Sequence, residues 1–164
     1  MKARIPQRQR ILNPLARPTI RAMLFRCAAQ TLIEVFNFGG SGRKLAELED
    51  GVKARLAKYD ALSEDTGKVT QAMVADAKKM NIEYIVRPGS GEKVLVGREP
   101  DIVYLAYLME LRQREGWAEV RLGRFHQELC RRIRYYNRTF DGTPDMVLPV
   151  MDDRLARYGK RPVT

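Results

Sequence analysis

The sequence predicts a mainly α protein built from a duplicated helix–glycine turn–helix unit, with a small β-hairpin between the two copies. Three observations lead to this prediction. Apolar residues recur at helical spacing over most of the chain, one short stretch has the character of β-strands, and the two helical pairs align without gaps. The 164 residues suit one compact domain, or two small subdomains that share a core, and a hydrophobic content of 45% is enough to bury a core.

The first half of the chain predicts three helices. The first begins at Pro18-Thr19, carries an apolar stripe to Val35, and ends at a glycine-rich stretch, 37–42, that is typical of a helix C-cap and a turn. A second helix follows with an apolar stripe over 45–59, and a third, shorter helix spans 70–80.

The middle of the chain changes its pattern. Two short β-branched runs, 82–87 and 93–97, flank Pro88-Gly89-Ser90-Gly91, and this arrangement predicts a β-hairpin. An isolated hairpin is only marginally stable in water. We therefore expect it to pack on the helices or to form a wing that faces a partner.

The second half predicts a helix that opens at Pro100-Asp101, because proline and an early acid favour a helix start. It ends near Gly116, and a long helix over 117–138 follows. The remainder is expected to be loop with one short helix over 152–158.

The two helical pairs align at an offset of 77 residues, which we interpret as a duplication. The aligned pairs are Ala29 with Ala106, Leu32 with Met109, Gly39 with Gly116, Lys44 with Arg121, Leu45 with Leu122, Leu48 with Phe125, Val52 with Leu129, Leu56 with Ile133 and Tyr59 with Tyr136. Any two amphipathic helices align to some degree, but the matched glycine and basic-Leu pair favour a true repeat. The predicted segments are a basic N-terminal arm (1–17), a first helical unit (18–81), the hairpin (82–98), a second helical unit (99–138) and a C-terminal tail with a short helix (139–164).

The turn of the second copy reads Gly116-Trp117-Ala118-Glu119-Val120-Arg121-Leu122-Gly123-Arg124-Phe125. It resembles a helix-start pattern, G-F-G-x-x-R-L-x-R-F, of small uncharacterised proteins from Firmicutes phages and prophages. Trp117 stands for the first aromatic residue and Ala118 for the second glycine. In the first copy Phe38-Gly39 is present, but Lys44 and Glu47 replace the two arginines. The resemblance implies an origin in a phage or mobile element, and no established activity.

Charge is the main indication of function. Thirty Lys and Arg residues against 20 Asp and Glu give a net charge of +10, which favours polyanionic partners. Residues 1–33 contain no acid, and an arginine cluster around Tyr135 and Tyr136 combines phosphate-binding groups with a ring that can stack on a base. The candidate nucleic-acid contacts are Arg4, Arg8, Arg10, Arg17, Arg43, Lys44, Arg121, Arg124, Arg131, Arg132, Arg134 and Arg138.

We therefore hypothesise a nucleic-acid-binding accessory protein of a phage or mobile element that grips the phosphate backbone of DNA or RNA. The alternative is an inhibitor of a host defence nucleoprotein, of the anti-CRISPR type, which acts by contact with protein or guide RNA. No apolar run is long enough to span a bilayer and no signal peptide is recognisable, so we expect a cytoplasmic location in the bacterial host cell and no membrane partner. A homodimer is compatible with the sequence.

An enzyme is disfavoured, and neither a cofactor nor a metal is expected. His126 is the only histidine, and no nucleophile or orienting group accompanies it. Cys27 and Cys130 are expected to be reduced thiols in helices, with a disulfide as the alternative if the two helices meet, and they are too few for a zinc site. The acidic group Asp141, Asp145, Asp152 and Asp153 lacks the strand context of a metal nuclease. Neither 39–44 nor 89–93 matches a phosphate-binding P-loop, so the first is interpreted as a turn and the second as a hairpin tip.

Overall fold

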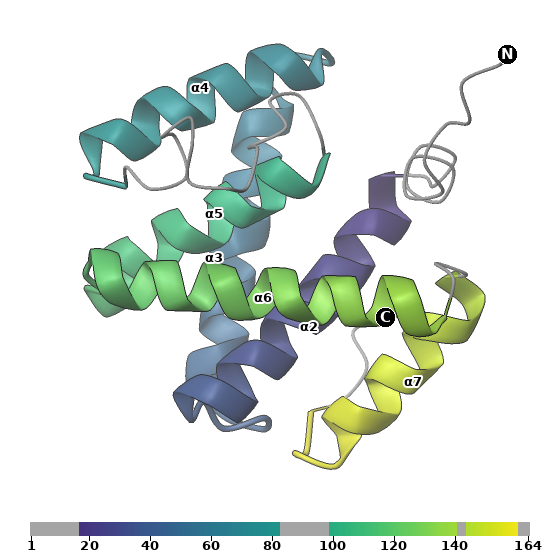
Figure 1. Cartoon of the computed structure of the whole chain (residues 1–164). Helices are drawn as coiled ribbons and strands as arrows, with labels where there is room; N and C mark the ends of the chain where they lie inside the picture. The colour runs from purple at the N-terminus through teal and green to yellow at the C-terminus, as the bar shows by residue number, and fades with distance from the viewer. Residues whose placement is uncertain (1–16, 83–98, 141–143, 161–164) are drawn as a thin grey trace, which may run out of the picture. The chain divides into compact units, whose positions relative to one another are not determined.

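The computed structural model describes residues 17–82, 99–140 and 144–160, which form six α-helices (Figure 1). The helices are α2 (Arg17–Phe36), α3 (Arg43–Asp60), α4 (Thr66–Lys79), α5 (Glu99–Glu115), α6 (Glu119–Thr139) and α7 (Pro144–Ala156). The mainly α prediction is confirmed. The arm predicted for 1–17 and the hairpin predicted for 82–98 lie outside these ranges, apart from one residue of each.

The contacts divide the chain into two compact units. The central unit comprises residues 43–127 and so contains α3, α4, α5 and the beginning of α6. The terminal unit comprises residues 1–42 and 128–164, with α2, the remainder of α6 and α7. The helices α2 and α3 form the first copy of the proposed repeat. By this division, they belong to different units.

In the central unit α5 packs against both α3 and α4. The stripe predicted for α3 is buried along its length, and Leu48 and Val52 are fully enclosed. The helix α4 begins four residues earlier than predicted because the Asp65 side chain accepts a hydrogen bond from the N–H of Gly67 at 2.9 Å, which caps the first turn. It ends at Lys79, and Asn81, two residues later, has a φ of 59°, the left-handed conformation that commonly follows a helix.

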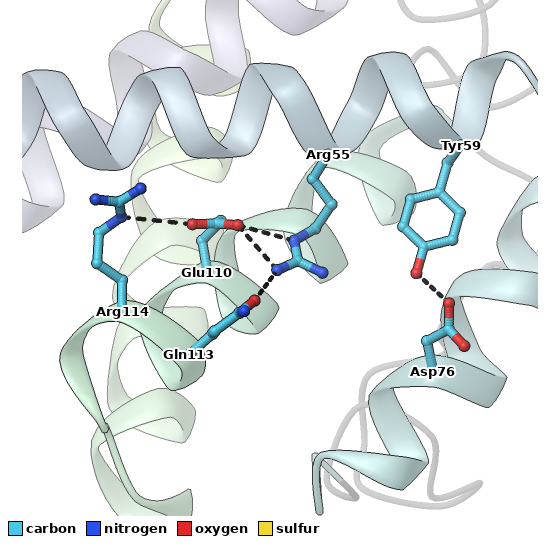
Figure 2. A network of polar contacts seen from close by, with 6 residues as sticks. All are labelled: Arg55, Tyr59, Asp76, Glu110, Gln113 and Arg114. Carbon is cyan, nitrogen blue, oxygen red and sulfur yellow. Dashed lines mark hydrogen bonds and ion pairs between the residues drawn. The ribbon is translucent and has the colours of Figure 1, made fainter.

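Polar side chains also connect the helices of the central unit (Figure 2). The Arg55 guanidinium on α3 donates two hydrogen bonds, of 3.1 and 2.9 Å, to the Glu110 carboxylate on α5. Arg114, one turn after Glu110, approaches the other carboxylate oxygen at 3.5 Å. The hydroxyl of Tyr59 on α3 donates to Asp76 on α4. Burial, followed by the hydrogen bond and charge of Asp76, raises the pKa of Tyr59 to about 12.

In the terminal unit α2 packs against α7. The helix α7 corrects the sequence prediction, because it begins at Pro144 rather than at 152 and replaces most of the expected loop. Proline is favoured in the first turn of a helix, and Val147, Met151 and Leu155 recur every four residues as a buried stripe. Pro149 lies inside the helix, where its missing N–H disfavours the conformation, so the burial of this stripe outweighs a local cost.

The turns after α2 and α5 share a capping arrangement. Asn37 and Gly116 have φ values of 60° and 66°, and each is followed by a buried aromatic residue, Phe38 or Trp117. The N–H of each aromatic residue donates to the carbonyl six residues before it, at 3.0 and 3.4 Å. These equivalent caps are 79 residues apart, whereas the stripes of α3 and α6 match at an offset of 77. An alignment without gaps therefore cannot match the caps and the stripes at the same time. The duplication stays a prediction.

Candidate nucleic-acid interface

The helix α6 has two faces of opposite character. In the terminal unit its inner face contributes Leu129 and Tyr136, which are buried. Arg131, Arg134 and Arg138 recur at spacings of three and four residues, which puts them on one face of the helix, and all three are exposed. No acid occurs from Leu129 to the end of the helix. We call Arg131, Arg134, Tyr135 and Arg138 the arginine face.

The contacts of the arginine face leave its charge at the surface. Arg131 forms an ion pair of 3.3 Å with Glu128, three residues before it on the helix. The Nε of Arg134 donates to the carbonyl of Cys130 at 3.4 Å. An exposed ion pair between neighbours on a helix contributes only about 0.3–0.5 kcal/mol, so a phosphate competes readily for the same guanidinium.

The two adjacent tyrosines of α6 have different environments. Tyr136 is 2% exposed, and its hydroxyl donates to Gln30 Oε1 on α2 at 2.9 Å. Tyr135 is 52% exposed and lies edge-on to Tyr136, with ring centroids 5.3 Å apart. Sequence reasoning noted both rings but did not place either in the site. Tyr135 lies one turn from Arg131 and Arg138, whereas Tyr136 lies two turns from Leu129 on the apolar side of the helix, and this spacing could have separated them.

We expect Tyr136→Phe to lower the free energy of unfolding by about 1–2 kcal/mol, because it leaves the buried Gln30 carboxamide without its hydrogen-bond donor. Chemical denaturation followed by circular dichroism measures this loss. Tyr135→Phe is the matched control, since it removes a hydroxyl from an exposed ring. Equal stability of Tyr136→Phe and the wild type would contradict a structural role for this hydrogen bond.

Arg132 lies on the same helix as the arginine face but serves a different purpose. It forms an ion pair of 2.8 Å with Glu34 on α2, and their side chains are only 15% and 13% exposed. Arg154 on α7 donates to the same carboxylate through Nε and Nη2, at 2.7 and 2.9 Å. This three-helix cluster joins α2, α6 and α7, so we assign Arg132 to the packing of the terminal unit rather than to a surface.

The electrostatics of this cluster favour an ionised Glu34. Burial alone favours the neutral carboxyl, but the hydrogen bonds and charges of Arg154 and Arg132 outweigh it and hold the pKa of Glu34 below its usual range. The same hydrogen bond to Glu34 raises the pKa of Arg154. The cluster therefore stays charged at neutral pH.

Other predicted contacts lie in the central unit or have no described side chain. Arg121 stacks over the Trp117 ring at 4.7 Å, and Arg124 is exposed. Arg43 and Lys44 form ion pairs with acidic side chains at 2.8 and 3.2 Å, which partly neutralise them. Arg4, Arg8 and Arg10 lie outside the described residues, as does the side chain of Arg17.

In the glycine turn before α3, Gly40 is packed closely against another segment of the chain. A Cβ on Gly40 would lie 2.3 Å from the backbone oxygen of Tyr158, just after α7. Such a distance is far inside van der Waals contact, so this position requires glycine. The observation supports the interpretation of 39–44 as a turn for its first four residues, whereas Arg43 and Lys44 already belong to α3.

The chemically reactive side chains have structural surroundings. Cys27 and Cys130 form no disulfide within the described residues, and burial raises the pKa of Cys27 to about 12, which keeps it protonated and unreactive. His126 packs edge-on against Tyr104, with ring centroids 5.4 Å apart. Asp152 forms an ion pair of 2.8 Å with Arg26. Within the part of the chain that the structure describes, no group of three or more His, Cys, Asp or Glu residues is placed to hold a metal ion.

None of the described helices is both long enough and apolar enough to cross a membrane. Comparisons with protein-family models, with curated proteins and with solved structures found no match to this chain. Function is therefore inferred from the surface chemistry of the described helices.

Proposed function

We propose that this protein is a nucleic-acid-binding accessory protein of a phage or mobile element and that it holds the phosphate backbone through the arginine face of α6. The observation that carries the proposal is the exposure of Arg131, Arg134 and Arg138 on a helix segment without acids. Arginine suits this task because its planar guanidinium can donate two parallel hydrogen bonds to one phosphate. The net charge of +10 adds a favourable long-range field.

The opposite face of α6 explains how these arginines are held. Leu129 and Tyr136 are buried, and the cluster of Arg132, Glu34 and Arg154 joins the helix to its neighbours in the terminal unit. The arginine side chains therefore project from a backbone that is fixed by packing. A fixed array of cations loses less conformational entropy on binding than the same residues in a loose tail.

Replacing Arg131, Arg134 and Arg138 together by glutamine should weaken binding to nucleic acid by about 10- to 100-fold at moderate salt. Each phosphate contact releases condensed counterions, so the slope of log affinity against log salt should also fall by about 2–3. Fluorescence anisotropy with labelled single- and double-stranded DNA and RNA, between about 50 and 200 mM salt, measures both quantities.

Two variants control for charge and for geometry. Replacing Lys58, Lys68 and Lys78 by glutamine removes the same net charge from exposed positions of the central unit and should change affinity far less. Replacing the three arginines by lysine keeps the charge and should retain most of the salt dependence. Affinity that does not depend on salt, or a glutamine variant that binds like the wild type, would contradict the proposal. Nuclease-resistant capture of one host protein would then favour the inhibitor hypothesis.

A further inference from the structure

We infer that Tyr135 is a stacking platform for one unpaired base and that the arginine face therefore selects single-stranded nucleic acid over a duplex. This inference rests on the proposed function, because the same helix face must first hold the backbone. The observations that carry it are the exposure of the Tyr135 ring, its support by Tyr136, and its position between two arginines.

Tyr135 is an exposed ring that other aromatic residues support from below. Its edge-on partner Tyr136 is fixed by the hydrogen bond to Gln30. Tyr136 in turn stacks on Phe140, with centroids 6.1 Å apart and an interplanar angle of 25°. A supported ring loses little freedom when a ligand stacks on it, and this makes an exposed aromatic residue an effective binding group.

The arginines are placed on both sides of this ring along the helix. Arg131 precedes Tyr135 by four residues and Arg138 follows it by three, so all three share one side of α6. At the helical rise, the two arginines lie about 6 Å before and about 4.5 Å after the tyrosine along the axis. A base on Tyr135 would therefore have cations on both sides for its flanking phosphates.

Stacking distinguishes the two forms of nucleic acid. In a duplex each base is covered above and below by its neighbours, so a side chain reaches only the base edges in the grooves. In a single strand the faces of the bases are accessible, and proteins bind them by combining aromatic stacking with a basic surface. The pairing of one supported ring with three exposed arginines fits the single strand.

The test compares a labelled oligothymidylate of about 12 nucleotides with a strand of the same length that lacks its bases. Both carry the same phosphates, so their difference in affinity measures contact with bases. We expect the wild type to bind the base-containing strand about 5- to 100-fold more tightly. Tyr135→Leu should abolish most of this difference, whereas Tyr135→Phe should retain it because stacking requires only the ring.

Two further ligands complete the design. An oligouridylate of the same length distinguishes RNA from DNA as the natural source of the single strand. Whichever of the oligothymidylate and the oligouridylate binds more tightly identifies that source. A duplex of the same length should bind more weakly than the single strand. Equal affinity for the strands with and without bases, an unchanged preference in Tyr135→Leu, or tighter binding of the duplex would overturn the inference.

The arginine variants separate this inference from the proposed function. If Tyr135→Leu has no effect while the triple glutamine variant loses salt-dependent binding, the proposed phosphate contacts are supported and the proposed base stacking is wrong. If the triple glutamine variant also binds like the wild type, both proposals are wrong. Thermal unfolding of each variant confirms that the change is not a loss of fold, since Tyr135 and the three arginines are exposed.

Discussion

Replacing Glu110 by alanine should lower the free energy of unfolding by about 3–5 kcal/mol, because it leaves a buried guanidinium without its counter-charge. Glu110 is 8% exposed and accepts two hydrogen bonds from Arg55, whose side chain is itself mostly buried. Figure 2 shows that this carboxylate lies between Arg55 on α3 and Arg114 on α5. Chemical denaturation followed by circular dichroism measures the loss.

Two variants test the cause of this loss. Glu47 is about half exposed and pairs with arginines at the surface, so Glu47→Ala should cost less than about 1 kcal/mol. A Cβ on Gly51 would lie 2.5 Å from Glu110 Oε2, so Gly51→Ala should destabilise the wild type by displacing the carboxylate. In the Glu110→Ala background the carboxylate is absent and only the flexible end of Arg114, at 3.2 Å, has to shift, so the same change should stabilise the helix by about 0.5–1 kcal/mol. Equal effects of Gly51→Ala in both backgrounds would contradict this description.

Replacing Glu34 by glutamine should lower the free energy of unfolding at pH 7 by about 2–4 kcal/mol, since Arg132 is then left buried without its ion pair. This loss of unfolding free energy should be smaller than for a fully buried ion pair, because Arg154 is 42% exposed and can turn its guanidinium toward water.

The effect of Glu34 should depend on pH in a defined direction. Because folding lowers the pKa of Glu34, its ionised form stabilises the native state above the ordinary value of 4.5, and this contribution is lost as pH falls through the folded value. The difference in unfolding free energy between wild type and Glu34→Gln should therefore be constant near neutral pH and shrink below about pH 4.5. Glu119→Gln, an exposed change at the start of α6, is the control. A difference that persists unchanged into acid would contradict the assignment.

The helices were largely predictable because their signals are local. Helical periodicity and the glycine after α5 place α2, α3, α5 and α6 within a few residues of their observed bounds. The helix α7 was underestimated because Pro144 and Pro149 are typical of loops, and only its packing against α2 reveals the buried stripe behind them.

The candidate site was predictable in part. The helical spacing of Arg131, Arg134 and Arg138 puts them on one face, and the structure leaves all three side chains exposed. Arg132 has the same residue type and an adjacent position, but its environment differs because Glu34 and Arg154 come from segments far away in the chain. The sequence of α6 alone therefore does not indicate that Arg132 has these partners.

The sequence by itself determined the mainly helical class, the excess of positive charge and the alignment of three arginines along one helix, because each depends on composition or on spacing within one segment. The tertiary structure alone decided which residues support the exposed tyrosine of α6, which arginine is held in a largely buried ion pair with another helix, and where α7 begins. These features depend on packing between distant segments, where burial and the pairing of charges set the energy of each side chain.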